Sequence, residues 1–111
     1  MTSAEGASPQ VFRVCSSAEL AEGALRSAVL GGRPVAVARQ DGRLYAFGAL
    51  CPHQHADLGY GLLESGAIRC ADHLWRFELA TGSCSSVPGA KLPVYLVRES
   101  GGEILVELVP R

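Results

Sequence analysis

Two mixed cysteine–histidine pairs lie in the middle of the chain: Cys51-Pro52-His53 and Cys70-Ala71-Asp72-His73. Sixteen residues separate His53 from Cys70, and the turn signal Glu64-Ser65-Gly66 lies between them. A hairpin at that turn would bring the two pairs together. Two thiolates and two imidazoles on two short loops can close around a metal centre. The spacing therefore predicts a metal site to which each loop contributes one cysteine and one histidine.

Three interpretations of these pairs compete. Unconnected residues of a β domain are disfavoured, because both pairs have ligand spacing and lie one hairpin apart. Structural zinc sites usually pair cysteine with cysteine and histidine with histidine, which differs from the mixed pairs here. In a [2Fe–2S] cluster with split ligation, both cysteines hold one iron and both histidines hold the other. Two parallel loops that each supply a cysteine and then a histidine suit this third arrangement, and zinc stays open as an alternative.

The composition is that of one ordinary globular domain of 111 residues, with 48% apolar and 19% charged residues. Ten basic and eleven acidic side chains give a net charge of −1, which argues against a nucleic-acid partner. No apolar run approaches the ~18 residues that span a bilayer. Residues 1–9 resemble a flexible tail and lack the apolar core of a secretory signal. We therefore expect a cytoplasmic protein with reduced cysteines and no membrane partner.

Most of the remaining chain carries β signals. A strand is expected to begin at Val11, and Asp41-Gly42 is a hairpin turn pair. In the last hairpin, apolar residues alternate at Leu92, Val94 and Leu96, the chain turns at 100–102, and a second alternating set follows at Ile104, Val106 and Leu108.

One short helix is also expected. Ser16-Ser17-Ala18-Glu19 fits a capping box, with serine at the N-cap and glutamate at the third helical position. This signal predicts a helix over about Ser17 to Ser27. Gly31-Gly32 would end the segment that contains this helix.

The two pairs and the residues after them resemble the Rieske [2Fe–2S] family. That family has Cys-x-His, a spacer of this length and Cys-x-x-His, followed by an aromatic strand, Thr-Gly and a proline loop. Here the strand contains Trp75 and Phe77, the dipeptide is Thr81-Gly82, and the loop contains Pro88-Gly89. The resemblance covers roughly residues 44–97. It implies an all-β Rieske fold of stacked antiparallel sheets in a single domain, with a cluster-binding subdomain at about 46–90.

The resemblance also implies a ligand set. Cys51 and Cys70 would hold the inner iron of one [2Fe–2S] cluster per chain, and His53 and His73 would hold the outer iron. Within the family, the chain is most similar to ferredoxin components of bacterial multicomponent aromatic-ring oxygenases, of the toluene monooxygenase kind. The respiratory branch carries an extra cysteine in each loop, joined as a disulfide. The positions here are Ala56 and Asp72, so the chain does not belong to that branch.

This branch implies a soluble one-electron carrier and not an enzyme. No Gly-x-Gly-x-x-Gly follows a strand, so NAD(P)H oxidation falls to a separate flavin-dependent reductase. The acceptor would be a terminal oxygenase that acts on aromatic or similar apolar compounds, and a shuttling carrier is expected to be a monomer. Two alternatives are the small subunit of an assimilatory nitrite reductase and a zinc-stabilised binding module.

The ligand set predicts the redox potential. Two ferric ions, two sulfides and two thiolates sum to zero, so an electron is added more easily than to a four-cysteine cluster. The respiratory branch has a serine hydroxyl two positions after its second histidine, where this chain has Trp75. We therefore expect a midpoint near the low end of the Rieske range of about −150 to +300 mV. Redox titration measures it, and a clearly positive midpoint would contradict the prediction.

Neighbouring residues are expected to support the site. His55, two positions after His53, is interpreted as an exposed loop residue. Trp75 and Phe77 are expected to form core under the cluster loops, and Pro88-Gly89 to shield the cluster from solvent. Cys15 and Cys84 are expected to be small buried apolar groups.

Overall fold

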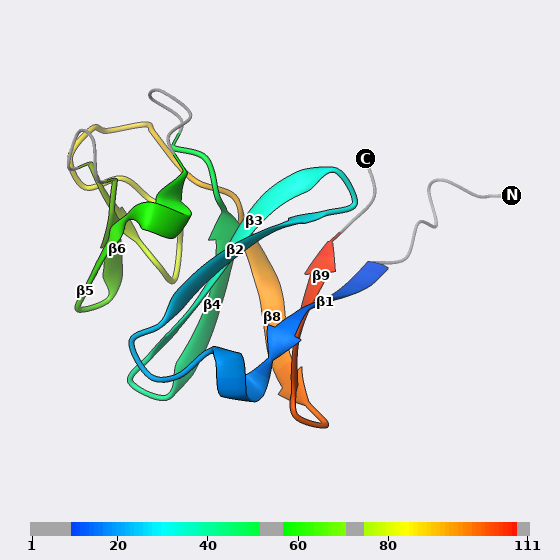
Figure 1. Cartoon of the computed structure of the whole chain (residues 1–111). Coiled ribbons are helices and arrows are strands. Elements are labelled where there is room, and N and C mark those ends of the chain that lie inside the picture. Colours follow the sequence, from blue (N-terminus) through cyan, green and yellow to red (C-terminus); the bar gives the residue numbers. More distant parts are fainter. Residues whose placement is uncertain (1–9, 52–56, 71–74, 109–111) are drawn as a thin grey trace, which may run out of the picture.

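The computed structural model describes residues 10–51, 57–70 and 75–108, which form two antiparallel sheets (Figure 1). The larger sheet has six strands in the order β1-β9-β8-β4-β3-β2. Their bounds are β1 Gln10–Ser16, β2 Leu25–Leu30, β3 Arg33–Gln40, β4 Arg43–Gly48, β8 Val94–Ser100 and β9 Glu103–Leu108. The smaller sheet contains β5 Leu62–Glu64, β6 Ala67–Arg69 and β7 Arg76–Glu78. This arrangement confirms the predicted all-β class.

Two 3-10 helices, η2 (Ser17–Glu19) and η3 (Leu58–Tyr60), are the helical elements among the described residues. Both are single turns, and the described ranges contain no candidate for a membrane-spanning helix. The predicted tail at 1–9 lies outside the described residues.

Tight turns join the strands of the larger sheet where the sequence predicts them. Asp41 and Gly42 have φ angles of 54° and 74°, the left-handed pair that a two-residue type I′ hairpin uses. Gly101 and Gly102, with φ angles of 59° and 79°, join β8 to β9 in the same way. Both predicted hairpins are confirmed.

The larger sheet curls, so that its edge strands β1 and β2 approach each other around a first core. Alternate residues fill this core: Val35 and Val37 of β3 and Val106 of β9 are at most 1% exposed. The edges meet closely, since a Cβ on Gly31 would lie 2.9 Å from the ring of Phe12. A side chain at Gly31 would therefore push the two edges apart.

The predicted helix over Ser17–Ser27 is wrong beyond its first turn. The Glu19 carboxylate does accept the capping-box hydrogen bond from the Ser16 backbone N–H (2.9 Å), and it accepts a second bond from the Ser16 hydroxyl (3.0 Å). The chain then leaves the helix, and Leu25–Leu30 pairs with β3 along its whole length. A short isolated helix is marginal in water, and the strand instead buries Leu30 and completes a ladder of backbone hydrogen bonds.

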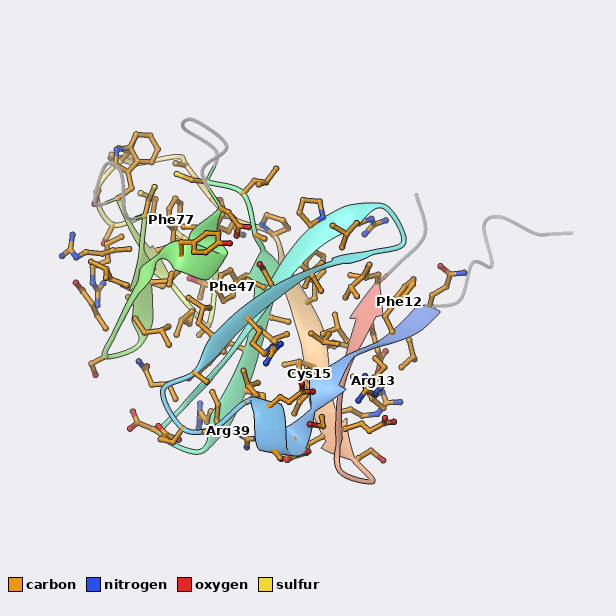
Figure 2. The ribbon with its side chains drawn as sticks, viewed as in Figure 1. Phe12, Arg13, Cys15, Arg39, Phe47 and Phe77 are labelled. Atoms are coloured by element: carbon orange, nitrogen blue, oxygen red, sulfur yellow. The ribbon has the colours of Figure 1, made fainter. Side chains whose placement is uncertain are left out.

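The smaller sheet packs on the outer face of β3 and β4 (Figure 1). There Ala36 and Ala38, both fully buried, face away from the first core, and their small side chains let the second sheet approach closely. Phe47 from the larger sheet and Phe77 from the smaller one belong to this second core (Figure 2). β3 is thus covered on both faces, and the second core fixes the smaller sheet to the larger one.

Gln40, at the end of β3, also joins the two sheets. Its side-chain N–H donates to the Glu64 carbonyl, and its side-chain oxygen accepts from the Gly66 N–H at 2.6 Å. One amide thus holds both sides of the β5–β6 turn. This turn is the one predicted to bring the two cysteine–histidine pairs together.

Gln40→Ala is expected to destabilise the chain by about 1–2 kcal/mol, because two part-buried backbone groups lose their partner. Urea denaturation measures the change, and hydrogen exchange should be faster at the Gly66 amide. Gln10→Ala, on an exposed strand end, is the matched control and should change stability by less than about 0.5 kcal/mol. Equal effects of the two substitutions would contradict a role of the Gln40 amide in holding the β5–β6 turn.

Candidate metal centre

The structure places both predicted thiol ligands in the second core. Cys51 follows β4 by three residues, and Cys70 directly follows β6. They are 0% and 1% exposed and share a buried cluster with Leu58 and Phe77. The two thiols thus lie in one buried core, each in the segment that follows a strand of a different sheet. His53 and His73 lie outside the described residues, so their roles stay predictions.

Backbone hydrogen bonds join the residues that flank each of the two segments between the described ranges. For the first, Leu50 and Asp57 form an antiparallel bridge, and the Leu58 N–H donates to the Ala49 carbonyl at 2.6 Å. For the second, the Cys70 N–H donates to the Trp75 carbonyl at 2.9 Å. Each cysteine therefore stands at the closed base of the segment that carries its histidine.

The two bases are also adjacent to each other. A Cβ on Gly61 would lie 2.5 Å from the Arg69 carbonyl, next to Cys70. The β5–β6 hairpin between them turns where the sequence predicts, with Glu64 opposite Ala67. The same Cβ on Gly61 would lie 3.0 Å from the Leu58 carbonyl, so the described end of the first segment and the described start of the second are neighbours, as ligation of one centre by both requires.

None of the four cysteines forms a disulfide. Cys15 lies in the first core, where burial raises the pKa of its thiol and keeps it protonated. Cys84 lies in the second core and is 8% exposed, and its sulfur accepts a hydrogen bond from the Val87 N–H at 3.3 Å. Both are buried groups, as predicted.

The donor set fits a metal centre. Cys51 and Cys70 bring two soft sulfur ligands to one apolar, water-excluded site. Among the described residues no three histidine, cysteine, aspartate or glutamate side chains form a group that could hold a metal ion, and the two histidines that would complete this set lie outside those residues.

The two predicted aromatic residues belong to the second core, as expected, while their position under the ligand loops stays a prediction. Phe77 is fully buried and Trp75 is half-buried against the same core, with ring centroids 6.4 Å apart and a 45° tilt. In the following loop, Val87 packs on this core while Pro88 and Gly89 are exposed. The loop is therefore anchored next to the thiols.

The charged residues near the site form a network that the sequence did not reveal. Arg69 and Arg76 are directly paired across β6 and β7, which places two like charges side by side. Glu64 bonds both guanidinium groups, and Glu78 bonds Arg76. No sequence pattern predicts that Glu64 pairs with both arginines, because these contacts depend on the register of three strands.

The network makes a prediction about acid stability. Hydrogen bonds from Arg69, and then from Arg76, hold the pKa of Glu64 below its ordinary value of 4.5. The stabilisation is therefore complete above that value and is lost as the pH falls towards the lower pKa of the folded state. Glu64→Gln should flatten the fall in unfolding midpoint between about pH 5 and pH 3. Parallel pH profiles for the variant and the wild type would contradict this.

Comparison with known proteins identifies the family. Residues 10–104 match the family model of the Rieske [2Fe–2S] domain. The chain belongs to the Rieske [2Fe–2S] family. Its cofactor is accordingly one [2Fe–2S] cluster, and the resemblance of the two motifs is confirmed.

The Rieske relatives include whole ferredoxin components. The chain is 29% identical over 98 residues to the ferredoxin component of the alkene monooxygenase system of Xanthobacter autotrophicus, covering 87% of this chain and 80% of the relative. It is 30% identical over 97 residues to the ferredoxin component of biphenyl 2,3-dioxygenase of Rhodococcus jostii, covering 86% and 91%. These relatives are electron-carrier components and not catalytic subunits.

Solved Rieske structures show the same fold. A ferredoxin in a complex of reduced oxygenase and oxidised ferredoxin in carbazole 1,9a-dioxygenase is 32% identical with a TM-score of 0.77, covering 86% of this chain and 99% of that one. A putative NADH-dependent nitrite reductase small subunit from Mycobacterium tuberculosis is 27% identical with a TM-score of 0.84, covering 94% and 99%.

Proposed function

We propose that this Rieske protein is a one-electron carrier of a multicomponent oxygenase system. It takes electrons from an NAD(P)H-dependent flavoprotein reductase and passes them to a terminal oxygenase that acts on aromatic or similar apolar compounds. The observation that carries the proposal is the pair of buried thiols, Cys51 and Cys70, at the closed bases of two adjacent loops. The match to nearly the full length of an oxygenase ferredoxin supports the partners.

Each iron of the cluster would have two of the four predicted ligands. Cys51 and Cys70 would hold the inner iron, and His53 and His73 would hold the outer iron. The bound cluster supplies reversible one-electron transfer at a fixed potential. The second core keeps water from the thiol side, and the pinned loop bases hold the ligands in place. The exposed Pro88-Gly89 loop would limit solvent access at the other side.

The organisation follows the same proposal. We propose that residues 1–111 form a single domain with a cluster-binding subdomain at about 46–90, and the predicted tail at 1–9 lies outside the described residues. The described part of that subdomain contains the smaller sheet and both thiols. The carrier is a monomer in the cytoplasm.

The test begins with the chain purified after anaerobic reconstitution with iron and sulfide. A red-brown protein with equal amounts of iron and sulfide, and a low-average-g EPR signal on reduction, is the expected result. A colourless protein with one equivalent of zinc would establish the zinc-stabilised module instead. Reduction by the flavoprotein, followed by product formation with the oxygenase, then tests the electron path.

A nitrite reductase small subunit has a closely similar fold, so the same samples should be tested for that role. The carrier proposal expects no stable association with a nitrite reductase large subunit and no effect on nitrite reduction. Stoichiometric co-purification with such a subunit would favour the alternative.

A further inference from the structure

The short helix η3 presents one aromatic ring to solvent. Tyr60 is 82% exposed and stands between Gly59 and Gly61. A Cβ on Gly59 would lie 2.6 Å from the Ser27 hydroxyl of β2, and one on Gly61 would lie 2.5 Å from the Arg69 carbonyl. The helix is therefore wedged between the two sheets, with its glycines inward and its tyrosine outward.

The backbone that carries this ring is held by local bonds. The Asp57 carboxylate accepts from the Gly59 N–H at 2.7 Å, and the Asp57 carbonyl accepts from the Tyr60 N–H at 3.1 Å. Leu58, the first residue of the turn, is fully buried in the second core. A tyrosine on a fixed turn loses little conformational freedom on binding, which is what an interface anchor needs.

The turn that carries the ring follows directly on the base of the first predicted ligand loop, because Asp57 is both its N-cap and the bridge partner of Leu50. Leu50, which precedes Cys51, is 40% exposed and bridges to Asp57 at the base of the first loop. Next to Leu50 the surface is hollowed by about 180 Å³. The hollow is lined by Arg33, Pro34, Gly48, Ala49, Pro93 and Tyr95. Leu50 and Tyr60 are therefore both tied to Asp57 at the base of the first loop, Leu50 through the bridge and Tyr60 through its backbone N–H.

The charges around this apolar surface are mutually compensated. Between residues 57 and 79 of the described chain, Glu64, Arg76 and Glu78 share ion pairs, and Asp57 caps η3. Arg69 is paired with Glu64 as well. Asp57 and Arg33, which lines the hollow, add one charge of each sign, so the described charges nearly balance and long-range electrostatic steering by them would be weak.

We propose that Leu50 and Tyr60 are the apolar anchors on which the terminal oxygenase docks to receive the electron. The inference rests on the proposed function, because electron transfer requires the acceptor to cover the end of the molecule that carries the ligand loops. A related ferredoxin forms a solved complex with its oxygenase. The oxygenase surface that receives these two side chains is expected to be apolar and weakly charged, because aromatic side chains are frequent anchors in such contacts.

The test uses the cluster-loaded chain and the terminal oxygenase from the same gene cluster, with the reductase in excess. Tyr60→Ala should raise the KM for the carrier by about fivefold or more, and Leu50→Ala should do so by a smaller factor. Tyr60→Phe should behave as wild type, since the ring and not the hydroxyl makes the contact. The matched control is Leu96→Ala, on β8 away from the loops and 71% exposed, which should leave KM unchanged.

Two further readouts separate docking from damage to the site. The midpoint potential and visible spectrum of Tyr60→Ala should match those of the wild type. Raising the salt from about 50 to 500 mM should change the wild-type KM by less than about threefold. Wild-type protein that cannot reduce the oxygenase overturns the proposed function itself. If the wild-type protein reduces the oxygenase but Tyr60→Ala has an unchanged KM, only the assignment of the anchors is overturned. The same holds if the wild-type KM rises more than about tenfold with salt.

Discussion

Cys51→Ala and Cys70→Ala should each leave the purified protein without its cluster. Each substitution removes one of the two sulfur ligands proposed for the inner iron, and no water can replace it in a site that is 0–1% exposed. We expect bound iron to fall below about a tenth of the wild-type value, with loss of visible absorption, because metal affinity depends on a complete ligand set.

Cys84→Ala is the matched control for these variants. Cys84 is buried in the same core, so its replacement removes a thiol of the same size from the same surroundings. It should keep full iron content, and losing the bond from the Val87 N–H should cost about 1 kcal/mol of stability. Cys15→Ala, in the first core, should also keep the cluster.

The comparison has a clear contrary outcome. Iron retained in Cys70→Ala but lost in Cys84→Ala would move a ligand to Cys84 and overturn the proposed set. Zinc is measured in the same samples, so a wild-type protein that binds one zinc and no iron would end the [2Fe–2S] assignment for this chain.

Gly82→Ala is expected to have the largest effect on folding. Gly82 has a φ of +81°, and a Cβ there would lie 2.1 Å from the Leu92 carbonyl oxygen. That carbonyl belongs to backbone and cannot swing aside. The Gly82 N–H donates to Glu78 at 2.7 Å, and its carbonyl accepts from Leu92 at 2.8 Å, so a shift would break both bonds. We expect a loss of about 3–5 kcal/mol.

Gly102→Ala separates the two causes of that loss. Gly102 has a φ of +79°, nearly the same as Gly82, but a Cβ there would meet nothing within 4 Å. It should cost only about 1–2 kcal/mol, the penalty of a left-handed backbone alone. Urea denaturation of both variants gives the difference, which is due to the collision with Leu92. Equal losses would show that the close approach is not maintained in solution.

Gly82 also explains part of the motif that follows the ligands. The Thr81-Gly82 dipeptide marks where the chain leaves β7 and passes along the backbone that leads into β8. Leu92, opposite Gly82, is 1% exposed and part of the second core. A glycine is needed there because two backbone segments touch, and the motif is thus a packing requirement of the fold.

Local signals in the sequence were sufficient for the turns, the β class and the thiol positions. Asp41-Gly42 predicts its hairpin because a left-handed pair is inexpensive only for such residues. The spacing from Cys51 to Cys70 predicts neighbouring loops because a hairpin of that length returns the chain to its starting point. Both relations act over short stretches of chain and are therefore readable from the sequence alone.

Tertiary structure decided the features that depend on distant partners. The capping signal at Ser16 was real, yet Leu25–Leu30 became a strand because β3 offered it a complete ladder. Leu96 belongs to the same alternating set as the buried Leu92 in the sequence, but it is 71% exposed in the structure because its face of β8 lies at the surface there. Periodicity tells which side chains share a face, whereas burial depends on which element packs against that face.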